Sequence, residues 1–363
     1  MTAFRTRTAI QTVRPGVAAV QTDVSAPRVR PDYVIAETKA FALNPTDYHH
    51  VDRLAAPGLI IGCDWSGIVR EVGGNVTRFK PGDAVYGVCH GGNNSEPEDG
   101  AFADMIACKE HTMMHKPDSL SFEESASLGV ALVTVGQALY WVMKLPLPSP
   151  NIAPNSGPSL LVYGGSSATG TIAIQSAKLS GMRVYTTCSP SNRELVKSRG
   201  ADAWFDYNQP DCIEQLKATG VSFPFIVDCI GSEESSVFCS KVLSPSGGHY
   251  HSIKAPLPEM FKAHRPEESA VATTALGYTM LGEDFEMPGI ATIPADPAQE
   301  NFAKEWALLA DNLVANGHIR PHAVQVREGG LDGVLRGLEE MRSSGPRGQK
   351  MVYLQDESEK RWN

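Results

Sequence analysis

The spacing of apolar and polar residues changes once along this chain. Between about residues 29 and 108, short β-branched or alternating runs are separated by Gly, Pro, Asn and Asp. They predict strands at 33–36, 67–72 and 83–88. Because no helical pattern intervenes, these closely spaced strands predict a small, barrel-like β domain.

A helical pattern begins near Ser121 and continues to about Lys144, with Ser121 and Glu124 as a capping box. Its most apolar part, 128–143, contains Thr134 and Gln137 and is shorter than the roughly 20 residues of a membrane-spanning helix, so we expect a buried helix. Residues 145–158 hold five prolines and predict a loop at a domain boundary.

From residue 160 the chain alternates between strand and helix patterns, which predicts a doubly wound parallel sheet. Strands are expected at 160–163, 183–187, 204–205, 225–229 and 248–253, and helices from the turn at 164 through Lys178 and around 192–199. Apolar residues at helical spacing in 302–313, with Gly317 as a stop, predict a later helix. Residues 349–354 predict a last strand that returns to the first domain.

The turn between the strand at 160–163 and the next helix is rich in Gly and Ser. Gly164 and Gly170 stand at its ends, and Ser166 and Ser167 stand where a further Gly is common. Small residues let backbone N–H groups approach a phosphate, and the helix N-terminus adds its positive dipole end. The turn therefore predicts a dinucleotide site, although a plain connection explains it equally well in isolation.

Composition narrows the class of function. A chain of 363 residues with 42% hydrophobic and 20% charged residues predicts a globular protein of two domains. Its net charge of −9 gives no electrostatic reason to expect nucleic acid or an anionic membrane as a partner. Seven cysteines without a CxxC pair and an N-terminus without an apolar signal region predict reduced thiols and a cytoplasmic location.

Several segments in order resemble the medium-chain dehydrogenase/reductase superfamily: 42–47, 61–69, 76–83, the turn at 164–170, and 199–202. The runs 145–150, 187–190, 197–201 and 247–250 are similar to the fungal trans-acting enoyl reductases. This resemblance implies an α/β protein with a Rossmann cofactor domain and a GroES-like β-barrel catalytic domain. It implies a GroES-like catalytic domain at 1–135, a Rossmann NADPH-binding domain at 136–300, and a return segment at 301–363 that completes the catalytic domain.

The same resemblance implies NADPH as cofactor and an enoyl thioester as substrate. The acyl group would be carried by a highly reducing polyketide synthase, with the reductase favoured as a monomer and a dimer possible. A free-standing quinone or alkenal reductase shares the framework and stays an alternative. A protein that binds NADPH without turnover is a further alternative.

Zinc-dependent members of the superfamily use a Cys and a His as ligands and four further cysteines in a lobe. Here Asn44 and Pro45 stand at the expected Cys, and Cys63 stands at the expected His. Cys89 and Cys108 are too far apart for a close-spaced lobe. We therefore expect a metal-free reductase, with an ordinary polar role for the adjacent His49 and His50.

The segment after the second strand of the cofactor domain favours NADPH. NAD-specific sites place a carboxylate there, whereas this chain offers hydroxyls and the cations Arg193 and Lys197. A solvated helix face is the alternative explanation of the two cations. By resemblance the cofactor-binding residues are Thr46, Asp47, Tyr48, His49, Gly164, Gly165, Ser166, Ser167, Ala168, Thr169, Ser189, Pro190, Ser191, Asn192, Lys197, Tyr207, Ile253, Lys254, Pro346 and Arg347.

Reduction of an enoyl group needs donors for the growing oxyanion and a source for one proton. By resemblance the catalytic residues are Thr46, Tyr48, His49 and Thr134. Relatives often carry a Lys at His49, so Tyr48 or water could be the proton donor instead. The substrate-binding residues implied are Thr134, Val135, Gly136, Gln137, Ala138, Leu139, Tyr140, Trp141, Gly277, Tyr278, Thr279, Met280 and Leu281.

Overall fold

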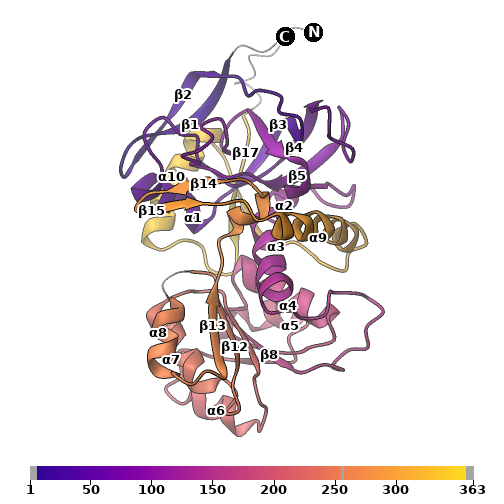
Figure 1. Cartoon of the computed structure of the whole chain (residues 1–363), viewed down its shortest axis with the longest axis vertical. Coiled ribbons are helices and arrows are strands. Elements are labelled where there is room, and N and C mark those ends of the chain that lie inside the picture. Colours follow the sequence, from indigo (N-terminus) through magenta and orange to yellow (C-terminus); the bar gives the residue numbers. More distant parts are fainter. Residues whose placement is uncertain (1–5, 255–256, 357–363) are drawn as a thin grey trace. The chain divides into compact units, whose positions relative to one another are not determined.

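A computed structural model describes residues 6–254 and 257–356, which fall into two compact units (Figure 1). Among these residues, the first unit contains the chain up to Val133, Tyr278–Gly317, and the chain from Pro321 onward. The second unit contains Thr134–Gly277 and His318–Arg320. Each unit has its own sheet.

The first unit is built on a seven-stranded sheet in the order β16-β17-β3-β4-β5-β7, with β6 on β3. All neighbours in it are antiparallel except β16 and β17. The unit's strands are β1 (Thr6–Arg14), β2 (Val17–Ser25), β3 (Tyr33–Ala42), β4 (Asp64–Val72), β5 (Ala84–Val88), β6 (Met105–Lys109), β7 (Met113–His115), β14 (Phe285–Met287), β15 (Ile290–Ile293), β16 (Val324–Arg327) and β17 (Lys350–Leu354).

The predicted return of the last strand is confirmed, because Val352 of β17 pairs with Ala42 of β3. The core beneath this sheet contains Trp65, Phe41 and Phe102, all fully buried, and the last two rings meet edge to face at 5.9 Å. Helices of the unit are α1 (Pro45–His49), η1 (His50–Leu54), η2 (Glu110–Thr112), α2 (Phe122–Ala126), η5 (Gly277–Leu281), α9 (Pro297–Ala315) and α10 (Gly330–Ser343).

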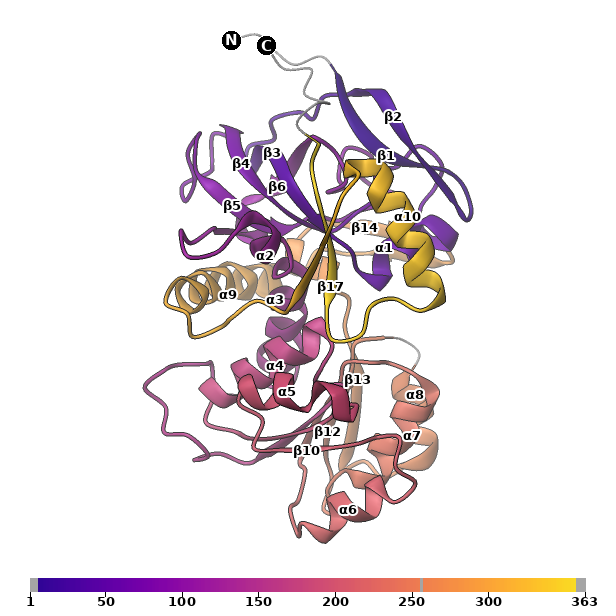
Figure 2. The same ribbon diagram turned by 180° about the vertical axis from the view of Figure 1, so that it is seen from behind.

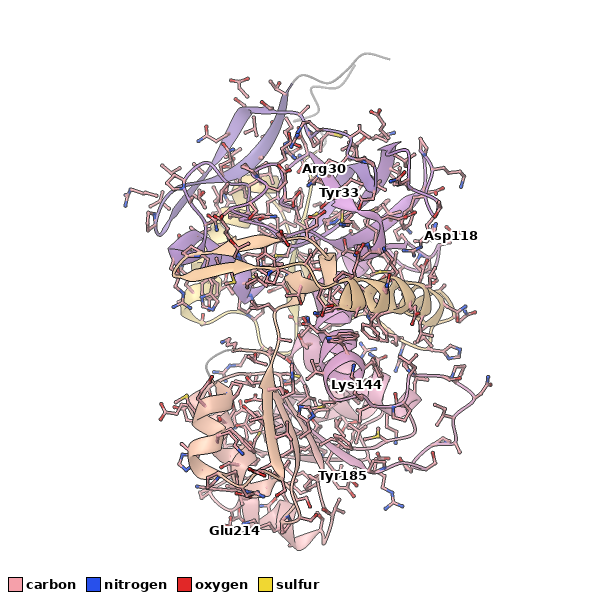
Figure 3. The ribbon with its side chains drawn as sticks, viewed as in Figure 1. Arg30, Tyr33, Asp118, Lys144, Tyr185 and Glu214 are labelled. Carbon is pink, nitrogen blue, oxygen red and sulfur yellow. The ribbon has the colours of Figure 1, made fainter. Side chains whose placement is uncertain are left out.

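The segment 278–300 differs from the expected boundaries, because its contacts place it in the first unit and not in a cofactor domain that extends from 136 to 300. The Glu283 carboxylate accepts hydrogen bonds from Tyr33 Oη at 2.8 Å and Lys109 Nζ at 2.8 Å. Arg30 in turn lies over the Tyr33 ring at 3.4 Å (Figure 3). This charged network anchors the segment to β3 and β6. No periodic pattern in the sequence predicts the network.

The second unit is a six-stranded sheet in the order β10-β9-β8-β11-β12-β13, in which all neighbours are parallel. Figures 1 and 2 show α4 and α5 on one side of it and α6, α7 and α8 on the other. The doubly wound sheet is thereby confirmed. Its elements are η3 (Gly136–Val142), β8 (Ser159–Tyr163), α4 (Ala168–Leu179), β9 (Arg183–Thr187), η4 (Pro190–Asn192), α5 (Arg193–Ser198), β10 (Ala203–Phe205), α6 (Cys212–Ala218), β11 (Phe225–Asp228), α7 (Glu233–Val242), β12 (Gly248–Ser252), α8 (Leu257–His264) and β13 (Ala270–Thr274).

The expected continuous helix from Ser121 to Lys144 is wrong in detail. It consists of α2, α3 (Gly129–Val135) and the π-helix η3. The capping box is confirmed, since Ser121 and Glu124 exchange hydrogen bonds at 2.9 and 3.2 Å. The interruption has a cause: the Asp64 carboxylate accepts from the Val130 amide at 2.7 Å and restarts the helix there.

The helical stretch Phe122–Val142 spans 21 residues, longer than the apolar segment expected from the sequence. By length and composition it passes the test for a membrane-spanning helix, and it is the one stretch among the described residues that does. Its most apolar window is 72% buried inside the protein, as in the core helix of a globular protein.

Candidate active site

The Gly/Ser turn connects β8 to α4 and is held by its own hydrogen bonds. Ser167 is the N-cap of α4: its hydroxyl accepts from the Gly170 amide at 3.0 Å and donates to the Gly164 carbonyl at 2.8 Å. Gly164 has φ of +80°. A Cβ on Gly165 would lie 1.9 Å from Thr186 Oγ1. The turn therefore needs glycine at these two positions and leaves the first amides of α4 for an anion.

This turn lies at the switch point of the sheet. From β8 the chain proceeds to β9 on one side, and β11 lies on the other. Parallel pairing aligns Tyr163 with Asp228, and Asp228 with Ser252. The carboxyl ends of the strands therefore form one row, which is where open α/β sheets bind ligands.

The predicted adenosine end of the site follows β9 and β10 in this row. The Ser189 hydroxyl lies 3.1 Å from that of Ser191 and accepts from Asn192 Nδ2 at 3.3 Å, with Pro190 at the start of η4. Lys197 is about half exposed, and its ammonium lies 3.6 Å from the Glu194 carboxylate, itself 73% exposed. An exposed pair of this kind holds its partners weakly, so Lys197 can reach an anion.

Three further predicted cofactor residues lie along the same edge. Tyr207 follows β10, is 41% exposed, and has its ring 6.3 Å from that of Tyr163. Ile253 and Lys254 follow β12, with the Ile253 amide bonded to the Asp228 carbonyl at 3.2 Å. The structure thus brings together every predicted cofactor residue of the second unit.

In the first unit, the predicted residues Thr46, Asp47, Tyr48 and His49 form most of α1. Pro45 occupies the first turn, and the Asp47 carboxylate accepts from the Asn44 amide at 2.7 Å. The side chain of Asp47 is 1% exposed, and its second carboxylate oxygen has no hydrogen-bond partner among the described residues. Burial raises the pKa of Asp47 to about 7. Asp47 therefore faces the interior.

Thr46 is the centre of a polar cluster. Its hydroxyl lies 3.0 Å from Tyr278 Oη and 3.3 Å from His50 Nδ1. Tyr278 Oη also lies 3.5 Å from Cys63 Sγ, and its ring stacks on that of His90 at 3.8 Å. The predicted catalytic Thr46 and the predicted substrate-lining Tyr278 are thus in direct contact.

Tyr48 and His49 are both partly exposed, with their rings 4.3 Å apart. The Arg53 guanidinium donates to His49 Nδ1 at 3.3 Å. Because a guanidinium only donates, Nδ1 is the acceptor and the proton of neutral His49 lies on Nε2. His49 thus has an N–H donor on its far side.

Asn44, which stands where the resemblance places a zinc-ligating Cys, takes part in a buried ion pair. The Lys350 ammonium contacts the Asp64 carboxylate, and Asn44 accepts from it at 2.9 Å while donating to Asp64 at 2.9 Å. All three side chains are buried. Across residues 6–254 and 257–356, no three His, Cys, Asp or Glu side chains gather where they could hold a metal ion.

The predicted substrate residues divide between the units. Thr134, Val135, Gly136, Gln137, Ala138, Leu139, Tyr140 and Trp141 belong to the second unit, where Gln137 donates to the Leu276 carbonyl, next to Gly277, at 3.0 Å. Thr134 and Trp141 are partly exposed, and Lys144 lies over the Trp141 ring at 4.0 Å. Ala138, Leu139 and Tyr140 are buried, so their side chains serve the core of this unit.

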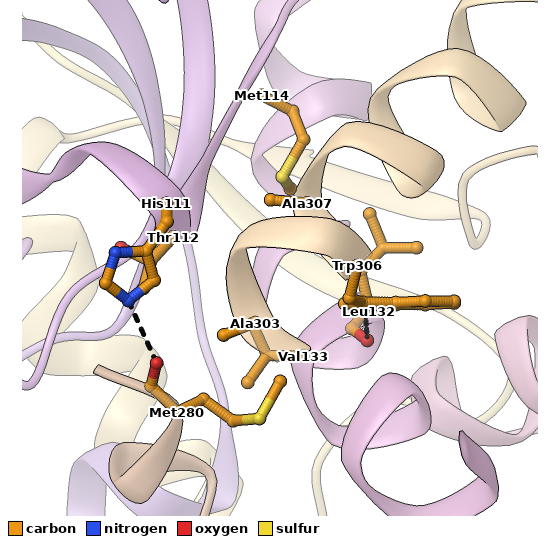
Figure 4. A pocket seen from close by; sticks show the side chains of 9 residues that line it. All are labelled: His111, Thr112, Met114, Leu132, Val133, Met280, Ala303, Trp306 and Ala307. Atoms are coloured by element: carbon orange, nitrogen blue, oxygen red, sulfur yellow. Dashed lines mark hydrogen bonds between the residues drawn. The ribbon is translucent and has the colours of Figure 1, made fainter. Parts of the chain in front are cut away.

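Tyr278, Thr279, Met280 and Leu281 belong to the first unit. His111 Nε2 lies 3.0 Å from the Met280 carbonyl, and the Met280 side chain lines a small apolar pocket between η2, α3 and α9 (Figure 4). Ala303, Trp306 and Ala307 of α9 form another wall. Contacts with η2 and α9 therefore hold the segment 278–281 in place.

Pro346 and Arg347 lie in the turn between α10 and β17, where Arg347 is exposed. The sequence did not predict the buried contacts of Lys350, Asp64, His90 and Glu283 in the first unit. Their signal is weak, because each partner lies far along the chain. A lysine at the start of an apolar strand was the one local sign of the buried pair.

Two family models match the chain. Residues 30–118 match the alcohol dehydrogenase GroES-like domain, and residues 168–258 match the zinc-binding dehydrogenase model. The trans-enoyl reductase resD of Aspergillus sclerotiorum is 39% identical over 360 residues, covering 95% of this chain and 99% of that protein. The trans-enoyl reductase TOXD of Cochliobolus carbonum is 42% identical over 288 residues, covering 79% of this chain and 94% of that protein.

Solved structures share the fold across almost the whole chain. The CurK enoyl reductase superposes with a TM-score of 0.73 at 19% identity, covering 96% of this chain and 99% of its own. The quinone oxidoreductase from Coxiella burnetii superposes with a TM-score of 0.71 at 22% identity, covering 96% and 98%. The combination of a GroES-like and a Rossmann domain is confirmed.

Proposed function

This chain belongs to the trans-enoyl reductase family, and on that premise we propose that it uses NADPH to reduce the α,β-double bond of an enoyl thioester in trans. The acyl group would be carried by a highly reducing polyketide synthase. The observation that carries this proposal is the Thr46 hydroxyl, which is partly exposed and lies 3.0 Å from Tyr278 Oη.

The residues at the carboxyl edge of the second unit fit a dinucleotide. The amides at the start of α4 would bind the pyrophosphate, and the missing side chain at Gly165 lets the turn pack closely against Thr186 of β9. Ser189, Asn192 and Lys197 would hold a 2′-phosphate, because hydroxyl, amide and ammonium groups donate. Lys197 would exchange its weak, exposed pairing with Glu194 for the phosphate. When bound, the cofactor would supply the hydride to the β-carbon.

The first unit would supply donors to the reacting thioester. As negative charge grows on the carbonyl oxygen, a hydroxyl or N–H aimed at it lowers the barrier. Thr46 is one such donor and His49 Nε2 is another. Tyr48, next to His49, or His49 in its imidazolium form would then give the proton to the α-carbon. Thr134 would line the substrate on the side of the second unit.

The assay follows NADPH oxidation with an enoyl-pantetheine thioester, with a quinone, and without an acceptor. Turnover of the thioester alone is the expected result. Turnover of the quinone alone would favour a free-standing quinone or alkenal reductase, and binding without turnover a non-catalytic NADPH-binding protein. We further propose that the protein is cytoplasmic and acts as a monomer.

The proton donor can be identified on the same substrate. His49→Gln keeps an N–H donor but cannot act as an acid, whereas Tyr48→Phe removes the phenol. If one variant loses turnover and the other retains it, the residue replaced in the inactive variant is the proton donor. If both variants keep wild-type turnover, water is the donor.

A further inference from the structure

We propose that Tyr278 is a positioning residue, which together with His50 turns the Thr46 hydroxyl proton toward a carbonyl oxygen of the bound substrate or cofactor. This inference rests on the proposed function, since that function supplies the ligand. The role proposed here for Tyr278 is to orient Thr46, which differs from its expected role of lining the substrate. The argument depends on which atom donates in each contact of the cluster.

The first contact fixes a proton of His50. Its Nδ1 lies 2.8 Å from the Thr46 carbonyl oxygen, which can only accept. Nδ1 therefore carries the proton and donates. The same N–H lies 3.3 Å from Thr46 Oγ1 and donates to it as the longer branch of a shared hydrogen bond. His50 is 3% exposed, which keeps it in this arrangement.

The second contact fixes the proton of Tyr278. A phenol is a stronger acid than an aliphatic alcohol, and the alcohol oxygen is the better acceptor. At 3.0 Å the Tyr278 hydroxyl therefore donates to Thr46 Oγ1. The alternative acceptor, Cys63 Sγ, is a weak one and lies farther away at 3.5 Å.

Two donors then occupy both lone pairs of Thr46 Oγ1. The remaining tetrahedral direction belongs to the Thr46 proton, which finds no acceptor within the cluster. Because Thr46 is partly exposed, this proton is available to a ligand. A donor oriented before the reaction costs no reorganisation when charge develops on the acceptor.

The ring of Tyr278 is itself held rigidly. It stacks on His90 at 3.8 Å with planes 10° apart, and Phe285 meets the two rings edge to face. Tyr278→Phe keeps this packing and removes only the hydroxyl. The variant therefore separates orientation of Thr46 from the structural role of the ring.

The test compares Tyr278→Phe, Thr46→Val, the double variant and Thr46→Ser. With the enoyl-pantetheine thioester at saturating NADPH, Thr46→Val is expected to lower kcat by about 10²-fold, as for loss of one oxyanion donor. Tyr278→Phe is expected to lower kcat roughly tenfold with KM unchanged, because the donor remains but is no longer oriented. Thr46→Ser should restore most of the turnover.

The double variant gives the decisive comparison. If Tyr278 acts through Thr46, the double variant has the kcat of Thr46→Val alone. Multiplied effects, or a Tyr278→Phe variant with wild-type kcat, would overturn the proposal. Tyr86→Phe is the matched control, since it also removes a fully buried phenol, in β5 and outside the cluster. It should keep wild-type kcat.

Two further readouts measure NADPH binding and thermal stability. NADPH fluorescence titration distinguishes the carbonyls: a Kd raised about tenfold in Thr46→Val assigns the nicotinamide carboxamide, and an unchanged Kd with lowered kcat assigns the thioester. A double-variant cycle on the thermal midpoint tests the Tyr278–Thr46 hydrogen bond itself. Additive midpoints would refute the proposal even if the wild-type protein reduces thioesters, whereas absent thioester turnover with coupled midpoints would refute only the proposed function.

Discussion

The ammonium group of Lys350 contacts the carboxylate of Asp64 inside the first unit, where β17 lies across β3 from β4. Lys350→Met would leave this carboxylate buried without its counter-ion. We expect a loss of about 3–5 kcal/mol in the free energy of unfolding, measured by urea denaturation.

A second variant checks the cause. Asp64→Asn in the Lys350→Met background removes the stranded charge and keeps an acceptor for the Val130 amide, so part of the stability should return. Lys80→Met is the control, because its 80% exposed side chain pairs with Asp83 at the surface and should cost less than about 1 kcal/mol. Equal losses at both lysines would contradict the buried pair as the source.

Gly165→Ala should abolish high-affinity NADPH binding. The added methyl group would lie 1.9 Å from Thr186 Oγ1, which is held by a 2.7 Å hydrogen bond to the Val162 carbonyl. The turn must therefore shift away from β9, at a cost of about 1–3 kcal/mol in stability. Gly74→Ala, where nothing lies within 4 Å, should leave both NADPH affinity and the thermal midpoint unchanged.

Lys197→Ala should raise the KM for NADPH roughly tenfold and leave the KM for NADH unchanged, since only NADPH carries the phosphate. The effect should shrink as salt is added, because the lysine is about half exposed. Lys217→Ala, in the last turn of α6, is the matched control. A similar change for both cofactors would rule out a 2′-phosphate contact.

The stability of the protein should depend on Asp47 between about pH 4 and 7. Burial raises the pKa of Asp47 from 3.8 to about 7 in the folded state. In this window the unfolded chain is ionised while the folded chain keeps its proton, so stability falls as pH rises and levels off above pH 7.

Asp47→Asn should flatten this slope, measured as the difference between wild-type and variant unfolding free energies. The amide oxygen still accepts from the Asn44 amide. Asp83→Asn should behave differently: against the effect of burial, hydrogen bonds from Lys80 lower the pKa of Asp83, so its contribution is lost only below about pH 4. A slope between pH 4 and 7 that persists in Asp47→Asn would assign it to another group.

The second unit follows closely from its sequence. Apolar strands such as Ser159–Tyr163 alternate with helices, and parallel pairing then places all carboxyl ends at one edge. Local pattern determines both the elements and the row of cofactor residues. The roles of Lys197 and the other predicted site residues stay predictions.

The first unit follows less closely. The hairpin of β1 and β2 has no clear periodic signal, and the helix restart at Val130 depends on Asp64, far away in sequence. Helix α10 does carry a helical pattern, in Leu331, Val334 and Leu338, although it is not among the expected elements. The Tyr278–Thr46 contact joins residues 232 positions apart. Such contacts arise from tertiary packing, which a single sequence does not display residue by residue.

The strand β17 also has a consequence for synthesis on the ribosome. Thr134–Gly277, which forms nearly all of the second unit, is made well before residues 350–354. The sheet of the first unit cannot add β16 and β17, nor Asp64 gain its partner, until those residues emerge. We therefore expect the cofactor-binding unit to fold first during translation, although the chain that begins the other unit is made earlier.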